Sequence, residues 1–372
     1  MSIRFRTVCA AAALAPLALL AACGSSGSTA SSSSASASAA PAASSGSGAT
    51  TLSETGSTLM FPLFGTWQTA YSTAVPAVTI TSGATGSGTG VADAATGTVT
   101  IGASDAYLSP AQTAQYKGLI NIPLTVAAVM VNYNVPGIKA PLNLSGTVLA
   151  KIYAGKITNW NDKAIAALNP GVTLPALKII TVHRADSSGS TFLFTSYLNA
   201  QDPTDWSSSN IGTTITWPSV PGSLAETGSG GMVTGAGGAK GSIAYIGISY
   251  LTKTTAAGLG TASLLNKGGK YTQPTGAAIN AALATFSGST PPSGTQSLIN
   301  TTAPTGYPII NYEYAVVKTT QPSAAVASAL KAFLTWTITT GSDAKTLATV
   351  GFEPLPSNVL TIAQNEIKSI KS

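Results

Sequence analysis

The sequence predicts an α/β protein, and three observations carry that prediction. Short runs rich in Val, Ile and Thr, which are typical of β-strands, alternate with stretches whose apolar residues recur at helical spacing. The chain has 372 residues, which is enough for a large core and, as a starting expectation, for two domains. Several strands end in Gly, Ser, Thr or Asp, where ligand-binding loops of α/β proteins lie. Alternation of this kind favours parallel sheets.

The predicted elements follow one another from about residue 51. The first helix, FPLFGTWQTAY, places Phe61, Phe64, Trp67 and Tyr71 on one face. The predicted strands are AVTITSG (77–83), VTIGASD (99–105), LTVAAVMVNYN (124–134) and LKIITVHRAD (177–186). The other predicted helices are SGTVLAKIYAG (145–155), STFLFTSYLNA (190–200) and PSAAVASALKAFLTWTIT (322–339).

The first 22 residues predict a lipoprotein signal peptide. MSIRFR is basic, and the apolar run TVCAAAALAPLALLAA after it is short for a membrane span. The run ends in LAAC, which resembles a bacterial lipobox, so we expect Cys23 to be lipidated and to become the mature N-terminus. An ordinary secretory signal with an incidental cysteine is the alternative. Because Cys9 would leave with the signal, no disulfide is expected in the mature chain.

A Ser-, Ala- and Gly-rich segment follows this cysteine. GSSGSTASSSSASASAAPAASSGSGAT (24–50) has too few apolar residues for a core, so residues 23–50 are predicted to be a lipidated cysteine and a flexible tether. Lipid, tether and globule together predict an extracytoplasmic protein that is anchored to the outer face of the cell membrane.

Composition argues against several classes of function. Charged residues make up 8% of the chain and are scattered, without a basic run, so we predict no nucleic-acid binding. A single histidine and no mature thiol leave no cluster with metal-ligand spacing. In NKGGKYT (266–272), Lys270 is followed by Tyr271, so the segment is not a P-loop, and no cofactor is predicted. The net charge is +6, and it would be +4 after loss of Arg4 and Arg6 with the signal peptide; this mild positive excess suits an anionic ligand.

Three loops of similar chemistry each lead from a strand or turn into a helix. They are TGSTLM (55–60), SGATGSGTG (82–90) and RADSSGST (184–191). The unpaired N–H groups and partial positive charge of a helix N-terminus favour an anion. Gly and Ser let the backbone approach such a ligand closely. Because ligands of open α/β sheets bind at the carboxyl ends of strands, the three loops predict one shared anion site.

The only histidine, His183, lies near Arg184, Asp186 and Ser188, which raises the alternative of a hydrolase. A catalytic base has to reach its serine. Neighbouring residues of a strand point to opposite faces, so His183 faces away if Arg184 faces the loop that contains Ser188. No serine here has a G-x-S-x-G context. We therefore predict that the chain is not an enzyme and that His183 has a packing or surface role.

Arg184 is the cationic candidate for the anion site. Its guanidinium offers a fork of N–H donors beside the amides that open a helix at Ser188, Gly189 and Ser190. Asp186 would hold the guanidinium in place. A surface ion pair with a helix cap is the alternative interpretation.

Asp105 is the second charged candidate, at the end of another predicted strand. A carboxylate repels an anion unless the ligand still carries a proton, in which case the carboxylate accepts its hydrogen bond. Hydrogen phosphate has such a proton at neutral pH and sulfate does not. Asp105 is thus predicted to discriminate between the two, because a buried acceptor that faces sulfate oxygen is unpaired. The alternative for Asp105 is an Asx turn or a helix N-cap.

With these residues in hand, the chain resembles the phosphate-binding proteins of bacterial phosphate ABC transporters. The resemblance covers about residues 53–360, and its most specific segments are IYAGKITNWND and RADSSGST. The full set of segments that carry it, including these two, is ETGSTLMFPLFGTWQTAY, GATGSGTGV, IGASDAYLS, IPLTVAAVMVNYNVPG, LAKIYAGKITNWNDKAIAALNPG, VHRADSSGSTFLFTSYL, GSIAYIGISY and GFEPLP.

This resemblance implies a two-domain periplasmic-binding-protein fold, the type II Venus flytrap, with mixed sheets and a central ligand cleft. Domain I would comprise residues 51–132 and 305–372, and domain II residues 133–304, with two strands crossing between them. The family's usual T-F-P segment reads T-L-M here, and Ser190 stands where threonine is common. The ligand contacts that the resemblance implies are Thr58, the backbone amide of Leu59, Ser87, Asp105, Arg184, Asp186, Ser188, Gly189 and Ser190.

The function implied is that of an extracytoplasmic receptor. It would bind inorganic phosphate and deliver it to the permease of a phosphate ABC importer, as a monomer that is held at the membrane through lipid on Cys23. One alternative is an extracellular phosphatase or esterase on a related fold, with Ser87, Ser188 or Ser190 as its nucleophile. Another is a surface sensor or adhesin derived from a binding protein.

Overall fold

The computed structural model describes residues 49–138 and 140–372. The first strand begins at Thr50, one residue before the predicted start of the globule. The predicted signal peptide (1–22), the lipidation site Cys23 and the tether up to residue 48 lie outside the described residues.

Short strands and mostly short helices alternate along the described chain. The strands are β1 (Thr50–Gly56), β2 (Val78–Thr81), β3 (Ile101–Ser104), β4 (Leu119–Tyr133), β5 (Asn143–Leu144), β6 (Ile180–Arg184), β7 (Leu224–Glu226), β8 (Ser242–Gly247), β9 (Gly260–Thr261), β10 (Ser263–Leu265), β11 (Tyr271–Thr272) and β12 (Ile310–Lys318). The helices are α1 (Phe61–Ala74), α2 (Ser87–Thr96), α3 (Pro110–Gln115), α4 (Gly146–Tyr153), α5 (Lys163–Leu168), α6 (Gly189–Gln201), α7 (Gly228–Gly238), α8 (Leu251–Ala256), α9 (Gly276–Leu283), α10 (Ala324–Thr337), α11 (Ala344–Ala348) and α12 (Ser357–Ser369), with short 3₁₀ turns η1 (Ser208–Asn210), η2 (Ile248–Tyr250), η3 (Ser287–Ser289) and η4 (Thr340–Ser342).

The main sheet has the strand order β2-β1-β3-β12-β4-β8-β6-β7, and β9 also pairs with β4. The pairs β1–β2, β1–β3, β6–β8 and β6–β7 are parallel. The two central strands differ, because β12 and β4 run antiparallel to each other and to their outer neighbours. The parallel sheets expected from alternation alone are therefore wrong at the centre, where the sheets are mixed. The physical reason is that neither β4 nor β12 pairs with the strand before or after it in the chain, so no βαβ crossover sets its direction.

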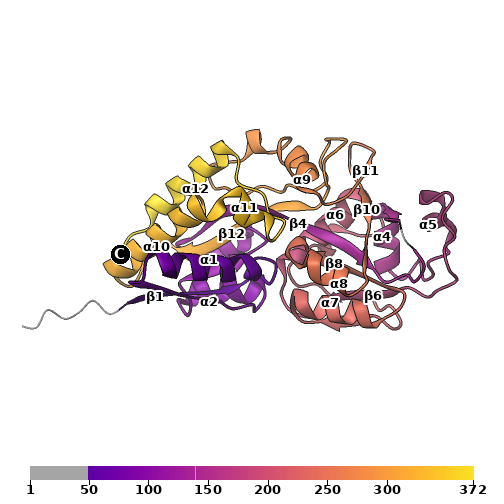
Figure 1. The fold of residues 1–372 in the computed structure, drawn as a ribbon, viewed down its shortest axis with the longest axis horizontal. Helices are drawn as coiled ribbons and strands as arrows, with labels where there is room; N and C mark the ends of the chain where they lie inside the picture. The colour runs from indigo at the N-terminus through magenta and orange to yellow at the C-terminus, as the bar shows by residue number, and fades with distance from the viewer. Residues whose placement is uncertain (1–48, 139) are drawn as a thin grey trace, which may run out of the picture. The chain divides into compact units, whose positions relative to one another are not determined.

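Strand β4 joins two halves of this sheet. Residues 119–128 of β4 pair with β12, and residues 129–133 pair with β8. Figure 1 shows β4 running from the elements around β1, α1 and α2 towards those around α6, α7 and β8. Nearly every residue of β4 and β12 is buried, which is typical of strands covered on both faces.

Helix α1 shows how the local pattern folds. Pro62 lies in its first turn, where a missing N–H costs nothing, and the buried face contains Phe64, Trp67 and Tyr71. The indole N–H of Trp67 donates to the carbonyl of Gly341 at 2.7 Å. Phe61 was also predicted on this face, but it is 36% exposed because the helix begins there and the buried stripe starts one turn later.

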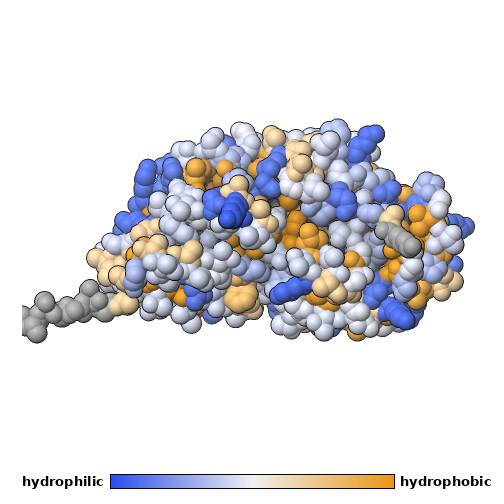
Figure 2. Space-filling model, viewed as in Figure 1, coloured by the Kyte–Doolittle hydropathy of each residue, from blue (hydrophilic) through white to orange (hydrophobic). Residues whose placement is uncertain are grey.

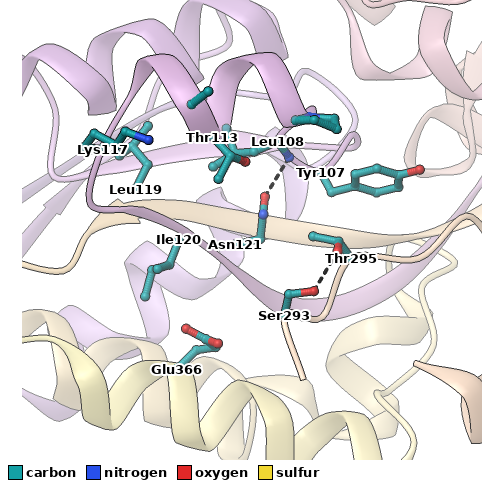
Figure 3. Close-up of a pocket in the computed structure, with 12 residues that line it drawn as sticks. Tyr107, Leu108, Thr113, Lys117, Leu119, Ile120, Asn121, Ser293, Thr295 and Glu366 are labelled. Carbon is teal, nitrogen blue, oxygen red and sulfur yellow. Dashed lines mark hydrogen bonds between the residues drawn. The ribbon is translucent and has the colours of Figure 1, made fainter. Parts of the chain in front are cut away.

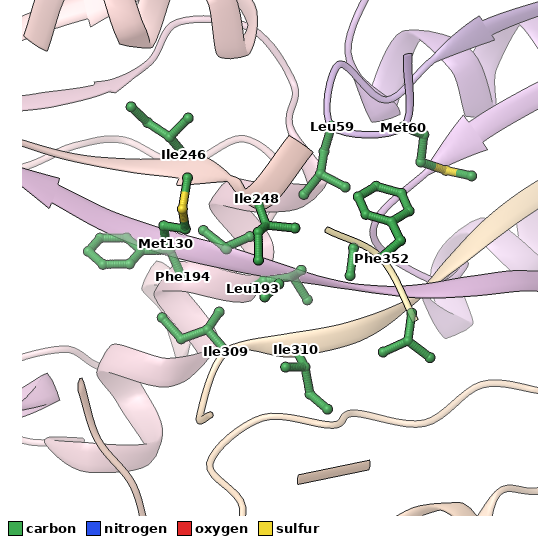
Figure 4. Packing of buried hydrophobic residues seen from close by; sticks show 14 of the residues in the cluster. Leu59, Met60, Met130, Leu193, Phe194, Ile246, Ile248, Ile309, Ile310 and Phe352 are labelled. Carbon is green, nitrogen blue, oxygen red and sulfur yellow. The ribbon is translucent and has the colours of Figure 1, made fainter. Parts of the chain in front are cut away.

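Apolar packing continues beside β4. Figure 4 shows Leu59, Ile248 and Phe352 gathered near Leu193 of α6. Each of these side chains is at most 3% exposed. They come from segments far apart in the sequence, so this packing fixes the loop after β1 against η2 and the segment before α12.

The surface agrees with the low charge of the sequence. Figure 2 shows strongly hydrophilic residues scattered among weakly polar and apolar ones on the viewed face, not gathered into one stripe. Among the described residues, no helix has both the length and the apolar character needed to cross a membrane.

Candidate functional site

The three loops singled out from the sequence meet in the folded protein. They follow β1, β2 and β6, and they lead into α1, α2 and α6. The segment after β3 adds Asp105. The side chains that these four segments bring together are each at most 5% exposed: Thr58, Ser87, Asp105, Arg184, Ser188 and Ser190. We call this set, with Asp186 and Gly189, the polar cluster.

Arg184 is the cation of the polar cluster. Its Nε donates to Asp186 Oδ1 at 2.6 Å, its Nη2 donates to Asp186 Oδ2, and its Nη1 donates to Thr58 Oγ1 at 3.2 Å. Asp186 also accepts a hydrogen bond from the amide of Gly228 at 3.1 Å. Burial by itself would raise the pKa of Asp186, but the hydrogen bonds and charge of Arg184 outweigh it and lower that pKa. Asp186 therefore stays ionised and orients the guanidinium, as predicted for this pair.

Asp105 accepts hydrogen bonds on both carboxylate oxygens. Ser57 Oγ donates to Oδ1, and Ser190 Oγ donates to Oδ2 at 2.7 Å. The backbone carbonyl of Asp105 accepts from the side-chain amide of Asn311 at 2.8 Å. The carboxylate is thus held by donors from the β1 loop and from α6, and it is not the N-cap of any helix in the described part of the chain.

Ser87 and Ser188 each open a helix. Ser87 is the first residue of α2, and its Oγ accepts from the amide of Gly189 at 3.0 Å. Ser188 is the N-cap of α6 and accepts from the amide of Thr191 at 3.4 Å. Two helix N-termini therefore point at the same cluster, which gives it the partial positive charge expected of an anion site.

Glycine makes the close approach of these loops possible. A Cβ on Gly189 would lie 2.6 Å from the Cβ of Asp105, and one on Gly86 would lie 2.6 Å from the carbonyl oxygen of Ser187. The amide of Gly88 donates to that same carbonyl at 3.1 Å. Only glycine at these positions lets the β2 and β6 loops and Asp105 come into contact.

Leu59 was predicted to contribute its backbone. It is fully buried, its carbonyl accepts a hydrogen bond from Ser249 Oγ at 2.7 Å, and its side chain packs against Gly247. Leu59 thereby connects the β1 loop to the end of β8, next to Thr58. The role of its amide in binding stays a prediction.

Two serines of the site were missed by the sequence analysis. Ser229, in the first turn of α7, is hydrogen-bonded through Oγ to Thr58 Oγ1 at 2.8 Å, and its amide donates to the same atom at 3.1 Å. Ser57 donates to Asp105. The signal for Ser229 is present in the sequence, because TGSGG (227–231) has the same Gly/Ser chemistry as the three predicted loops and also leads into a helix.

His183 lies apart from the serines. It is half-buried, its ring stacks on that of Trp217 with centroids 4.8 Å apart, and burial lowers its pKa. In the described part of the chain, its ring hydrogen bond goes to the carbonyl of Arg184 at 3.4 Å and none joins it to a serine. The strand alternation that separated His183 from Arg184 is confirmed.

A cavity of about 660 Å³ lies elsewhere, between α3, the start of β4 and α12 (Figure 3). Its walls are mostly apolar, and Figure 3 shows Asn121 accepting a hydrogen bond from the amide of Leu108, at 2.9 Å. No member of the polar cluster lines it. The candidate site is therefore identified by the side chains of the polar cluster and not by the volume of a cavity.

Comparison with known proteins decides the family. The PBP superfamily domain matches residues 41–340. The phosphate-binding protein PstS of Methanocaldococcus jannaschii is 32% identical over 340 residues, which cover 85% of this chain and 85% of the relative. The chain belongs to the PstS family of the PBP superfamily. PstS 3 of Mycobacterium leprae is likewise 32% identical, over 86% of this chain and 88% of its own.

Solved structures agree with the predicted fold of this PstS-family member. A phosphate-binding protein from Stenotrophomonas maltophilia superposes with a TM-score of 0.66 at 22% identity, over 85% of this chain and 94% of its own. The two-domain periplasmic-binding-protein fold with mixed sheets is thus confirmed, as is the family inferred from the motifs.

Proposed function

We propose that the protein is an extracytoplasmic receptor that binds inorganic phosphate and delivers it to a phosphate ABC importer. The observation that carries this proposal is the polar cluster, in which the Arg184 guanidinium paired with Asp186, several hydroxyls and two helix N-termini surround the Asp105 carboxylate. The related proteins named as phosphate-binding support the same ligand.

The donors suit a phosphate dianion. Arg184 supplies charge and a planar fork, while Thr58, Ser87, Ser188 and Ser190 supply neutral dipoles that are already in place. Asp105 accepts the proton of hydrogen phosphate. Sulfate has no such proton, so its oxygen would face the carboxylate without a hydrogen bond. Because the cluster is almost fully buried, phosphate enters only when the two domains move apart, and closure then removes it from water.

Replacing Asp105 with asparagine tests the discrimination. The amide of Asn can donate to sulfate, so the ratio of phosphate to sulfate affinity should fall by about tenfold or more. Isothermal titration of wild type and D105N with both anions measures the ratio. An unchanged ratio in D105N would contradict the role of Asp105, and a wild type that binds no phosphate would contradict the receptor itself.

The enzyme alternative has no support in the site. Ser87, Ser188 and Ser190 are buried and none is hydrogen-bonded to His183 within the described residues. The relatives are named as binding proteins, in agreement with the prediction that the chain is not an enzyme. The ABC permease is the expected partner of such a receptor. The domain boundaries at 132/133 and 304/305 stay predictions.

Anchoring through Cys23 and a monomeric state are further parts of this proposal. The lipobox-like LAAC and the tether after it support the anchor. Cys23→Ser should move the protein from the membrane fraction to the soluble extracytoplasmic fraction, as followed by fractionation and immunoblotting. Retention of C23S at the membrane would refute lipid anchoring at this residue. Light scattering of the C23S protein would report a dimer if the monomeric state is wrong.

A further inference from the structure

Strand β12 passes directly behind Asp105. Tyr314 pairs with Ser104 in the antiparallel register of β12 and β3, which places Glu313 beside Asp105. Asn311 lies two residues earlier, hence on the same face of β12, and its amide donates to the Asp105 carbonyl at 2.8 Å. The face of β12 that contains Asn311 and Glu313 is therefore the one next to Asp105.

Glu313 has no exposed surface, and neither of its carboxyl oxygens has a hydrogen-bond partner among the described residues. The side-chain donors nearest to Glu313 on β4 and β12 already donate to other groups. Thr125, its partner on β4, donates to the carbonyl of Glu353 at 2.8 Å, and the Asn311 amide donates to Asp105. An ionised carboxylate without any donor is strongly disfavoured in such a place.

A protonated carboxyl avoids this penalty, because it can itself donate. The charged acceptor beside it is Asp105, and burial together with the negative charge of Asp105 raises the pKa of Glu313 well above its usual range. Tyr314, next in the chain, stays neutral, since burial raises its pKa as well. The geometry and the electrostatics thus agree on a proton held between Glu313 and Asp105.

We propose that Glu313 is protonated in the folded protein and donates its O–H to the Asp105 carboxylate, as a positioning residue for anion discrimination. This inference rests on the proposed phosphate function. Asp105 then has three donors: Ser57 on Oδ1, Ser190 on Oδ2, and Glu313 from behind. The three together hold the carboxylate in the orientation in which it accepts the proton of bound phosphate.

Three variants separate this role from a merely structural one. Glu313→Gln keeps the shape and an N–H donor, and Glu313→Leu removes the donor. Glu54→Gln is the matched control, because Glu54 is also a buried carboxyl in the same sheet but contacts Ser82, outside the polar cluster. The ratio of phosphate to sulfate affinity should fall about tenfold or more in E313L. In E313Q and E54Q this ratio should stay within about threefold of the wild-type value.

Infrared spectroscopy tests the proton itself, independently of any ligand. At pH 7 the wild-type spectrum should contain the C=O stretches of two protonated carboxylic acids, Glu313 and Glu54, because the pKa of Glu54 is about 8. E313Q should lose the Glu313 stretch and keep that of Glu54, and E54Q should do the reverse. Loss of a carboxylate band in E313Q instead would overturn the proposal, as would an E313L ratio equal to that of wild type. If E313L fails to fold, the E313Q spectrum still decides. Wild type that binds no phosphate yet shows the Glu313 band would refute the proposed function while leaving the protonated carboxyl established.

Discussion

Replacement of Arg184 by methionine is expected to weaken phosphate binding by about 2–5 kcal/mol, or roughly 30- to 5,000-fold, because a buried charge pair loses one partner. Arg184 is 5% exposed and donates to Asp186 and Thr58. Without the guanidinium, the Asp186 carboxylate would keep backbone amides such as that of Gly228 as partners but no cation among the described residues, and it would repel the dianion. Titration calorimetry of R184M against wild type measures the loss.

Two further variants make this measurement specific. Arg184→Lys keeps the charge but loses the planar fork, so its affinity should lie between those of wild type and R184M. Lys156→Met removes an ion pair with Asp205 in which the lysine side chain is 58% exposed, and it should leave phosphate affinity unchanged. Equal affinities for R184M and K156M would show that Arg184 does not contact the anion.

Glu54→Gln is expected to stabilise the protein at pH 8 and to have much less effect at pH 5. Glu54 is 3% exposed, its Oε1 has no hydrogen-bond partner within the described residues, and burial raises its pKa to about 8. The hydrogen bond from Ser82 Oγ to Oε2, at 2.5 Å, and one from the amide of Gly83 oppose this shift but do not cancel it.

The sign follows from the two pKa values. In the unfolded chain Glu54 ionises near its ordinary pKa of 4.5, whereas in the folded protein it keeps its proton up to about 8. Between these values the folded state binds more protons, so stability falls as pH rises, by at most about 1.4 kcal/mol per pH unit. The stability that Glu54 contributes is complete below pH 4.5 and is lost once the pH passes 8.

Urea unfolding at several pH values between 5 and 8 measures this dependence. Glutamine at position 54 cannot ionise, so the difference in unfolding free energy between E54Q and wild type should grow steadily over the range, to several kcal/mol at most. Parallel pH dependences of the two proteins would show that Glu54 is ionised in the folded state.

Much of the candidate site was predictable because its signals are local. Strand alternation placed Arg184 and His183 on opposite faces, and the Ser-Gly-Ser sequence after Asp186 predicted the start of α6. Helix α7 was not predicted, because six of its 11 residues are glycine. Only proline has a lower helix propensity than glycine. Ser229 was missed with it. Glu313 was missed because the residues next to it in the sequence do not indicate that this strand packs beside Asp105.

The sequence by itself determined the α/β class, the family and the two charged residues at the centre of the site, since residue periodicity and motif order are properties of neighbouring residues. The tertiary structure alone decided that β4 and β12 run antiparallel at the centre and that Ser57, Ser190 and Glu313 surround Asp105. It also decided the contact between Thr58 and Ser229, which are 171 residues apart. Such contacts depend on how distant segments pack, and no local pattern encodes the partner of a buried polar group.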